Sequence, residues 1–197
     1  MKTFRQYIAE AMERAIHRTT PEAARQIRAH GFSLEYFGHG AGLGLFEEPC
    51  GVFLSRVDND DFAKEVEDRG LKMSEVIEVE FPADKIWKPT RNERIATSQK
   101  LETEFIMQKY SLNHDEAEIV RRGMIGKMKQ NPKLSDAFKD HVSNDVEIEF
   151  KKFFSKWLMD QGYTAVEWKE PVKGVNQVLV LDPKNIKVIK PKSDMTL

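Results

Sequence analysis

The spacing of apolar residues alternates between helical and strand-like periods in the first half of the chain. Apolar side chains from Phe4 to Met12 recur with a helical period and predict an amphipathic helix over 3–14. A short strand is predicted at 16–19, and Thr20-Pro21 and Gly31 are typical of the start and the end of a following helix. This half also predicts strands at 51–55 and 76–81, and a short helix at 62–69.

The second half is helical up to about residue 161 and then returns to strand-like spacing. Asn113 and Glu116 have the spacing of a capping box, and an aromatic stripe from Phe150 to Trp157 predicts the buried face of a helix. The last predicted strands are 163–168, 178–181 and 186–189. Because strands from both ends of the chain must share a sheet, we expect an α+β fold in which 89–161 is a helical insertion.

Composition narrows the classes of function. The 197 residues are 40% hydrophobic and 32% charged, as in ordinary globular proteins, and the net charge of −1 gives no basic field that would concentrate nucleic acid. Cys50 is the single cysteine, so no intramolecular disulfide or thiolate-rich zinc site can form, and a reducing, cytoplasmic setting is expected. No metal site is expected. No apolar run approaches the ~18 residues of a membrane helix, so no membrane partner is expected.

Four short motifs bracket the helical stretch. They are 16–22 (Ile-His-Arg-Thr-Thr-Pro-Glu), 51–55 (Gly-Val-Phe-Leu-Ser), 162–167 (Gly-Tyr-Thr-Ala-Val-Glu) and 177–186 (Gln-Val-Leu-Val-Leu-Asp-Pro-Lys-Asn-Ile). In this order they resemble the core strands of ADP-ribosyltransferases of the histidine type, in particular small phage-encoded members. The resemblance covers roughly 15–87 and 160–190 and leaves the helical stretch outside it.

The resemblance implies a fold and an activity. The fold would be a split β-barrel-like sandwich, a single ADP-ribosyltransferase-like domain over 1–197 with the insertion at 89–161. It would bind NAD as a substrate in a cleft and transfer ADP-ribose to a macromolecular acceptor. A phage origin would make that acceptor a host protein in the host cytoplasm, with nucleic acid as the less favoured alternative. The sequence does not give an oligomeric state.

The resemblance also assigns residues to the NAD site. His17 would contact a ribose hydroxyl of NAD, although a histidine at the edge of the core, with its nitrogens satisfied, is the alternative interpretation. Ser55 would hydrogen-bond the ribose, or would simply end its strand. The predicted NAD-contacting residues are His17, Arg18, Thr19, Phe32, Phe53, Ser55 and Phe62.

The departure from the family pattern is Gln177, which stands where the family has its catalytic glutamate. Glutamine keeps the hydrogen-bonding reach of the side chain but removes its charge, and such a loss costs several kcal/mol of barrier, on the order of a hundredfold in rate. Either the domain binds without catalysis, or it transfers slowly, or Glu167 or Glu170 supplies the charge. The candidate catalytic residues are therefore His17, Gln177 and Glu167.

Two classes of function follow from these residues. The first is an NAD-dependent ADP-ribosyltransferase whose helical insertion recognises the acceptor. The second is a catalytically degenerate module of the same fold that acts as an interaction protein, and Gln177 favours it. A weaker third hypothesis is a related RNA-end phosphotransferase, since 17–20 (His-Arg-Thr-Thr) is also similar to that family, but the further basic residues it needs have no clear match.

The insertion contributes two more patterns. A basic run could touch nucleic acid or an acidic partner, although a solvated helix face is the more usual explanation. The run comprises Arg121, Arg122, Lys127, Lys129 and Lys133. We expect the methionines of this region to be packing residues, since Met adapts to irregular gaps in a core. They are Met107, Met124 and Met128.

Overall fold

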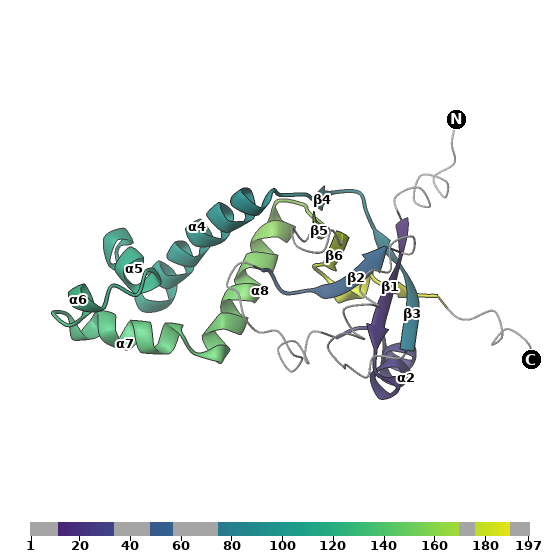
Figure 1. Ribbon diagram of the computed structural model, residues 1–197, viewed down its shortest axis with the longest axis horizontal. Coiled ribbons are helices and arrows are strands. Elements are labelled where there is room, and N and C mark those ends of the chain that lie inside the picture. The colour runs from purple at the N-terminus through teal and green to yellow at the C-terminus, as the bar shows by residue number, and fades with distance from the viewer. Residues whose placement is uncertain (1–11, 34–47, 57–74, 170–175, 190–197) are drawn as a thin grey trace, which may run out of the picture. The chain divides into compact units, whose positions relative to one another are not determined.

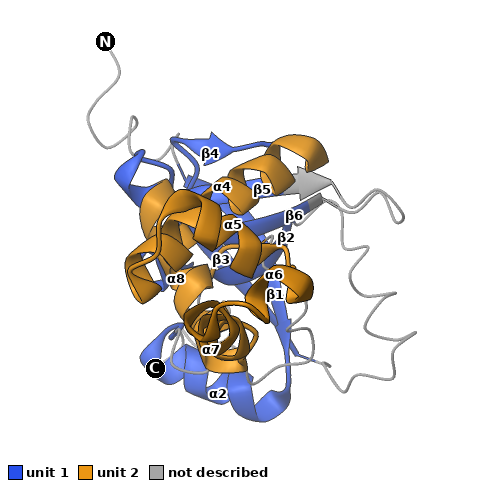
Figure 2. Cartoon of the chain, turned by 90° about the vertical axis from the view of Figure 1, so that its left-hand side faces the viewer, with its two compact units in different colours: residues 1–35, 51–89, 159–197 blue, residues 36–50, 90–158 orange. Residues whose placement is uncertain are grey.

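The computed structural model describes residues 12–33, 48–56, 75–169 and 176–189. The chain divides into two compact units, drawn in different colours in Figure 2. We call them the sheet unit (Met1–Glu35, Gly51–Pro89 and Met159–Leu197) and the helical unit (Tyr36–Cys50 and Thr90–Leu158). None of the helices in the described part of the chain combines the length and the apolar character that crossing a bilayer requires.

The sheet unit contains a seven-stranded mixed sheet whose strands come from both ends of the chain (Figure 1). All neighbouring strands are antiparallel except β4 and β5, which are parallel. The order across the sheet is β4 (Ile86–Trp87), β5 (Ala165–Lys169), β6 (Asn176–Val180), β2 (Val52–Arg56), β1 (Met12–Thr19), β3 (Glu75–Pro82) and β7 (Lys187–Val188). The expected α+β class is therefore confirmed.

The two faces of this sheet are told apart most clearly along β3. One face, the core face, carries the apolar side chains of the main hydrophobic cluster, among them Ala15, Leu54, Val79 and Val178. Along β3 the burial alternates, with Ile77, Val79 and Phe81 buried on the core face while Val76 and Glu78 are exposed on the other, which we call the outer face. On β5 and β6 residues of both faces are buried, among them Val166 and Leu179 of the outer face, so the faces of the other strands follow from their register with β3 and with one another.

Helix α2 (Pro21–His30) packs against the core face through Ala24 and Ile27. It begins where the sequence predicts, because the Thr20 side chain accepts a hydrogen bond from the Ala23 backbone N–H at 3.2 Å. It ends at Gly31, whose φ of 79° lies in the region that favours glycine. Both predicted boundaries are confirmed.

The predicted helix over 3–14 is wrong at its C-terminal end. Residues from Met12 onward belong to β1, which pairs with β3 from Met12↔Pro82 to Thr19↔Glu75. A continuous ladder supplies more backbone hydrogen bonds than one helical turn would, so pairing overrides the local period. Residues 3–11, and the predicted helix at 62–69, lie outside the described part of the chain.

The helical unit is built on its own core (Figure 2). Its helices are α4 (Arg91–Tyr110), α5 (His114–Arg121), α6 (Ile125–Met128), α7 (Pro132–His141) and most of α8 (Asn144–Asp160). Capping boxes start α4 and α5, the latter at the predicted pair Asn113 and Glu116. The apolar core residues of α4 to α7 are Ile106, Leu112, Ala117, Val120, Met128, Leu134 and Ala137. That the chain is one ADP-ribosyltransferase-like domain with an insertion stays a prediction.

The aromatic stripe of α8 packs against α4, as a core role predicts. Phe150 and Phe154 are fully buried. Phe105 of α4 meets Phe150 and Phe153 with ring centroids 5.6 Å apart in each pair. Such offset and edge contacts stabilise a core beyond the area that they bury.

Candidate functional site

The predicted site residues come together on three adjacent strands of the sheet unit. His17 is on β1, Ser55 is on β2 and Gln177 is on β6, and these strands are neighbours in the order β6-β2-β1. Ser55 stands directly opposite Gln177 in the ladder. The sequence motifs therefore identified strands that lie side by side although about 120 residues separate the last two along the chain.

The register nevertheless separates the side chains by face. Ile16, not His17, stands opposite Ser55, so Ile16, Ser55 and Gln177 share the outer face. His17 is the next residue along β1 and stands opposite Ile77, which belongs to the core face. Because successive side chains point to opposite faces, His17 cannot line one groove together with Ser55 and Gln177. The residues predicted to contact NAD therefore do not share one face of the sheet.

His17 is half-buried and its ring links β1 to β2. Its Nδ1 lies 2.9 Å from the Phe53 carbonyl oxygen. A carbonyl oxygen only accepts, so Nδ1 donates and the neutral ring keeps its lone pair on Nε2. The ring also meets Phe32 edge-on, with centroids 5.1 Å apart. Burial lowers the pKa of His17, against the opposing effect of the Phe53 hydrogen bond, so the ring is neutral at neutral pH.

This geometry gives His17 a structural task. The registered pairs between β1 and β2 are Ala15↔Arg56 and Ile16↔Ser55, and the described ladder does not extend further. The His17 ring bonds the backbone just beyond the end of that ladder. It therefore links the two strands beyond their last registered pair, a contact that is compatible with the alternative interpretation of a histidine at the edge of the core.

Glu167 lies on the core face, within a network of opposite charges. Arg56 donates to both carboxylate oxygens at 3.0 Å, and Lys88 lies 2.8 Å from one of them. Arg56 also pairs with Glu13. Burial by itself would raise the pKa of Glu167, but the hydrogen bonds from Arg56 and Lys88 outweigh it and hold the pKa below its ordinary value. The carboxylate is ionised, and its charge is matched by these cations.

Glu167 and His17 do not form a catalytic pair. They share the core face, but β5 and β1 are three strand spacings apart, about 14 Å along the sheet. Val178 stands opposite Glu167 and Leu54 opposite Val178, and both are part of the hydrophobic core. Apolar side chains therefore occupy the space between the carboxylate and the imidazole.

The remaining predicted residues are spread over both faces. Thr19 stands opposite Glu75 and is buried, on the same face as His17. Phe32 packs against the hydrophobic core. Arg18 and Phe53 point to the outer face, where the Phe53 side chain is 40% exposed. Phe62 and Glu170 lie outside the described residues.

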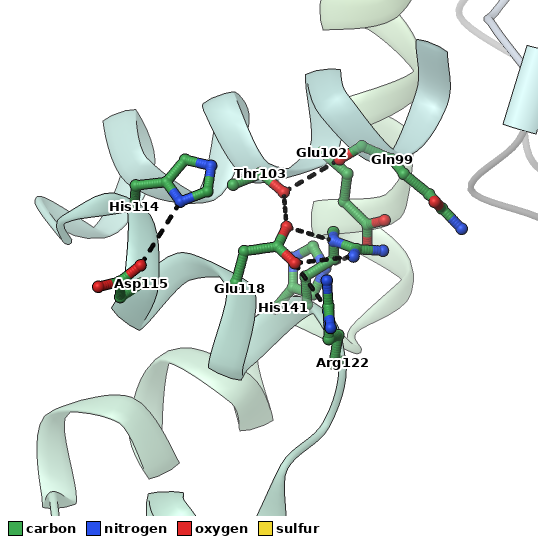
Figure 3. A network of polar contacts seen from close by, with 9 residues as sticks. Gln99, Glu102, Thr103, His114, Asp115, Glu118, Arg122 and His141 are labelled. Atoms are coloured by element: carbon green, nitrogen blue, oxygen red, sulfur yellow. Dashed lines mark hydrogen bonds and ion pairs between the residues drawn. The ribbon is translucent and has the colours of Figure 1, made fainter. Parts of the chain in front are cut away.

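A second polar cluster lies in the helical unit, and the sequence reasoning did not single it out (Figure 3). Glu118 of α5 accepts hydrogen bonds from Arg121 at 2.9 and 3.0 Å, from Arg122 at 2.7 Å and from the Thr103 hydroxyl of α4 at 2.5 Å. The hydrogen bond from Arg121 has the largest effect, and together with the contacts of Thr103 and Arg122 it outweighs burial and lowers the pKa of Glu118 to about 2. The spacing of a glutamate three and four residues before two arginines could have revealed this cluster.

The neighbouring pair Glu102 and His141 joins α4 to α7. His141 Nε2 lies 2.9 Å from a Glu102 carboxylate oxygen, and both residues are buried (Figure 3). The contact from Thr103 to Glu118 ties α4 to α5, and that from His141 to Glu102 ties α7 to α4. We therefore interpret this cluster as a set of cross-links between helices.

Metal binding and thiol chemistry find no support in the described residues. Over 12–33, 48–56, 75–169 and 176–189, no group of three or more His, Cys, Asp or Glu side chains is placed to hold a metal ion. Cys50 is buried, and this burial raises the pKa of its thiol to about 11. The sulfur is therefore protonated at neutral pH and is a poor nucleophile.

Comparison with known proteins adds little to this geometry. No protein-family model matches the chain, and no curated protein matches it significantly. Among solved structures, it is similar to one described as "Crystal structure of an anti-CRISPR protein", with 12% sequence identity and a TM-score of 0.35 over 92% of this chain and 98% of the other. A likeness this low carries no argument about the fold or the function of the chain.

Proposed function

We propose that this protein acts by binding a macromolecular partner and does not catalyse ADP-ribosyl transfer. The observation that carries the proposal is the register of β1, β2 and β6, which puts His17 on one face of the sheet and Ser55 and Gln177 on the other. An NAD-cleaving site needs these groups around one ribose, because catalysis depends on fixing the sugar and stabilising its developing charge in one place.

The chemistry of each candidate supports the same conclusion. Gln177 has no charge with which to stabilise a cationic sugar. Glu167 has one, but Arg56 and Lys88 already compensate it. His17 uses Nδ1 to hold the Phe53 carbonyl in place. Each group would have to abandon its present contacts before it could act on a substrate.

The resemblance to ADP-ribosyltransferases enters this proposal as the origin of the scaffold. In this view the split β-barrel-like sandwich of that family has been kept, while the glutamate position has changed to Gln177. The partner would be a host protein in the host cytoplasm, and NAD would be neither a substrate nor a cofactor. The α+β class alone does not decide between these functions, because one fold supports many.

The test is an NAD turnover and transfer assay on the full chain. We expect that wild type incubated with labelled NAD and host lysate neither releases nicotinamide nor labels a protein. We also expect Gln177→Glu to remain inactive, because the restored carboxylate would still point away from His17.

A matched pair of histidine variants gives the assay its control. His17→Ala removes the candidate ribose contact, whereas His30→Ala changes an exposed histidine at the end of α2. Nicotinamide release by wild type that disappears in His17→Ala and persists in His30→Ala would overturn the proposal in favour of the transferase. Activity created by Gln177→Glu would contradict the argument from register.

A further inference from the structure

The end of the turn between α5 and α6 and the first residue of α6 present apolar side chains to solvent. Ile125 is 61% exposed and Met124 is 37% exposed, although a packing role was predicted for this methionine. Met128, three residues further on, is buried in the core of the helical unit, so α6 is anchored while its first residues remain accessible. Exposed apolar groups that adjoin one another often mark an interaction site.

The backbone under these side chains is fixed. Gly123 adopts a φ of 60°, and a Cβ at this position would lie 3.4 Å from the Phe138 ring. The Met124 N–H donates to the Ile119 carbonyl at 3.0 Å, and the Met128 N–H donates to the Met124 carbonyl at 3.1 Å. A surface held in this way loses little conformational entropy when a partner binds.

The same segment carries a one-sided charge. Between Glu118 and Asp136 the sequence has no acidic residue. Glu118 forms ion pairs with both Arg121 and Arg122, so its single negative charge offsets one of the two. Lys127 and Lys129 are exposed, and neither forms an ion pair within the part of the chain that the structure describes. Two uncompensated lysines therefore border the exposed isoleucine and methionine.

We propose that Met124, Ile125, Lys127 and Lys129, together the α6 surface, dock into an apolar pocket on a partner protein whose rim carries aspartate and glutamate. This rests on the proposed function, since it names the surface by which the binding protein engages its partner. An apolar centre with a charged rim is the usual arrangement of a protein interface, and Met is enriched in such centres.

Two other occupants fit the surface less well. Nucleic acid would use Lys127 and Lys129 but would leave Ile125 without an apolar partner, and binding to phosphates usually engages many more cations. A second copy of this chain, related by a two-fold axis, would bring like surfaces together and place lysines opposite lysines. Charge complementarity thus favours an acidic protein surface over both.

The direct test is selection from a displayed library of random peptides on the immobilised full chain. We expect enrichment of peptides that combine bulky apolar residues with Asp and Glu. The best synthetic peptide is then measured by fluorescence polarisation against wild type and variants. Absence of enrichment, or enrichment of basic peptides, overturns the proposal.

Matched variants locate the binding. Ile125→Asp and the double variant Lys127→Glu/Lys129→Glu should each weaken peptide affinity at least ~10-fold, because they remove the anchor or reverse the rim charge. Val142→Asp changes another apolar residue of the helical unit that is 55% exposed, and Lys152→Glu changes another exposed lysine. Both controls should bind like wild type. Equal losses in the controls, or no loss in the test variants, overturn the proposal.

Two further measurements separate the other occupants. Fluorescent single-stranded and duplex DNA should not bind at physiological salt, and binding that the lysine double variant abolishes would replace the protein partner with nucleic acid. Sedimentation should show a monomer, and self-association lost in Ile125→Asp would point to a second copy. Absence of NAD turnover together with failed peptide selection would leave the proposed function standing and remove only this surface.

Discussion

Removal of the Glu118 charge should destabilise the helical unit. Glu118→Gln keeps the size of the side chain but takes away the charge that faces Arg121 and Arg122. It also places an amide where the Thr103 hydroxyl now donates to a carboxylate. Arg121, whose side chain is only 12% exposed, would be left without its ion-pair partner.

The size of the effect follows from the pKa of Glu118. A pKa lowered from 4.5 to about 2 corresponds to at most about 3 kcal/mol in favour of the charged form. The Glu118 side chain is 22% exposed, so solvent screens part of this interaction. We therefore expect Glu118→Gln to lower the free energy of unfolding by about 1–2 kcal/mol at neutral pH.

The pH dependence gives the sharper check. The folded pKa of Glu118 is lowered, so its contribution is complete above the unfolded value and is lost as the pH falls toward about 2. Urea unfolding followed by circular dichroism should show the full difference between wild type and variant near pH 7, and a shrinking difference between about pH 4 and 2. Glu104→Gln is the control, since the Glu104 side chain is 42% exposed and its contact with Lys100 is long, at 3.9 Å. A difference that does not change with pH, or equal losses in both variants, would refute the reasoning.

Four further substitutions, one of them a control, test close packing and helix capping. Gly51→Ala should lower the free energy of unfolding, measured in urea, by about 1–3 kcal/mol, because the added Cβ would lie 2.5 Å from the Val180 carbonyl oxygen. Gly126→Ala is its control, since a Cβ there meets nothing within 4 Å and should be neutral or slightly stabilising. Phe154→Ala should lower the free energy of unfolding by about 3–5 kcal/mol in the same measurement, because loss of this fully buried ring leaves a cavity. A loss below about 1 kcal/mol would show that the surrounding side chains close the cavity. Thr90→Ala should cost about 1 kcal/mol through loss of the α4 capping box, and an unchanged unfolding midpoint would contradict that role.

The features that the sequence predicted well are those decided locally. The cap at Thr20, the end of α2 at Gly31 and the capping box at Asn113 each depend on residues within one helical turn, so a short pattern suffices to find them. The α+β class also followed, because strand-like segments at both ends of the chain have to be paired.

The candidate site was harder to predict because it depends on register. The motifs correctly indicated β1, β2 and β6, but no local pattern shows that Ile16 rather than His17 stands opposite Ser55. A shift of one residue moves a side chain to the other face of the sheet. The exposure of Met124 was missed for a related reason, since it depends on how the α5–α6 turn lies over Phe138.

The position of β6 has a consequence for the order in which the protein folds during synthesis. β6 (Asn176–Val180) lies between β2 and β5, yet it is synthesised after β1 to β4 and after helices α4 to α8. Until then, β2 lacks its neighbour on the side away from β1, while the sequence of helices α4 to α7 is already complete. Pairing that closes such long loops is slow, whereas local helical contacts form quickly. We therefore expect nascent chains to acquire their helices first and to depend on chaperones until β6 has been released.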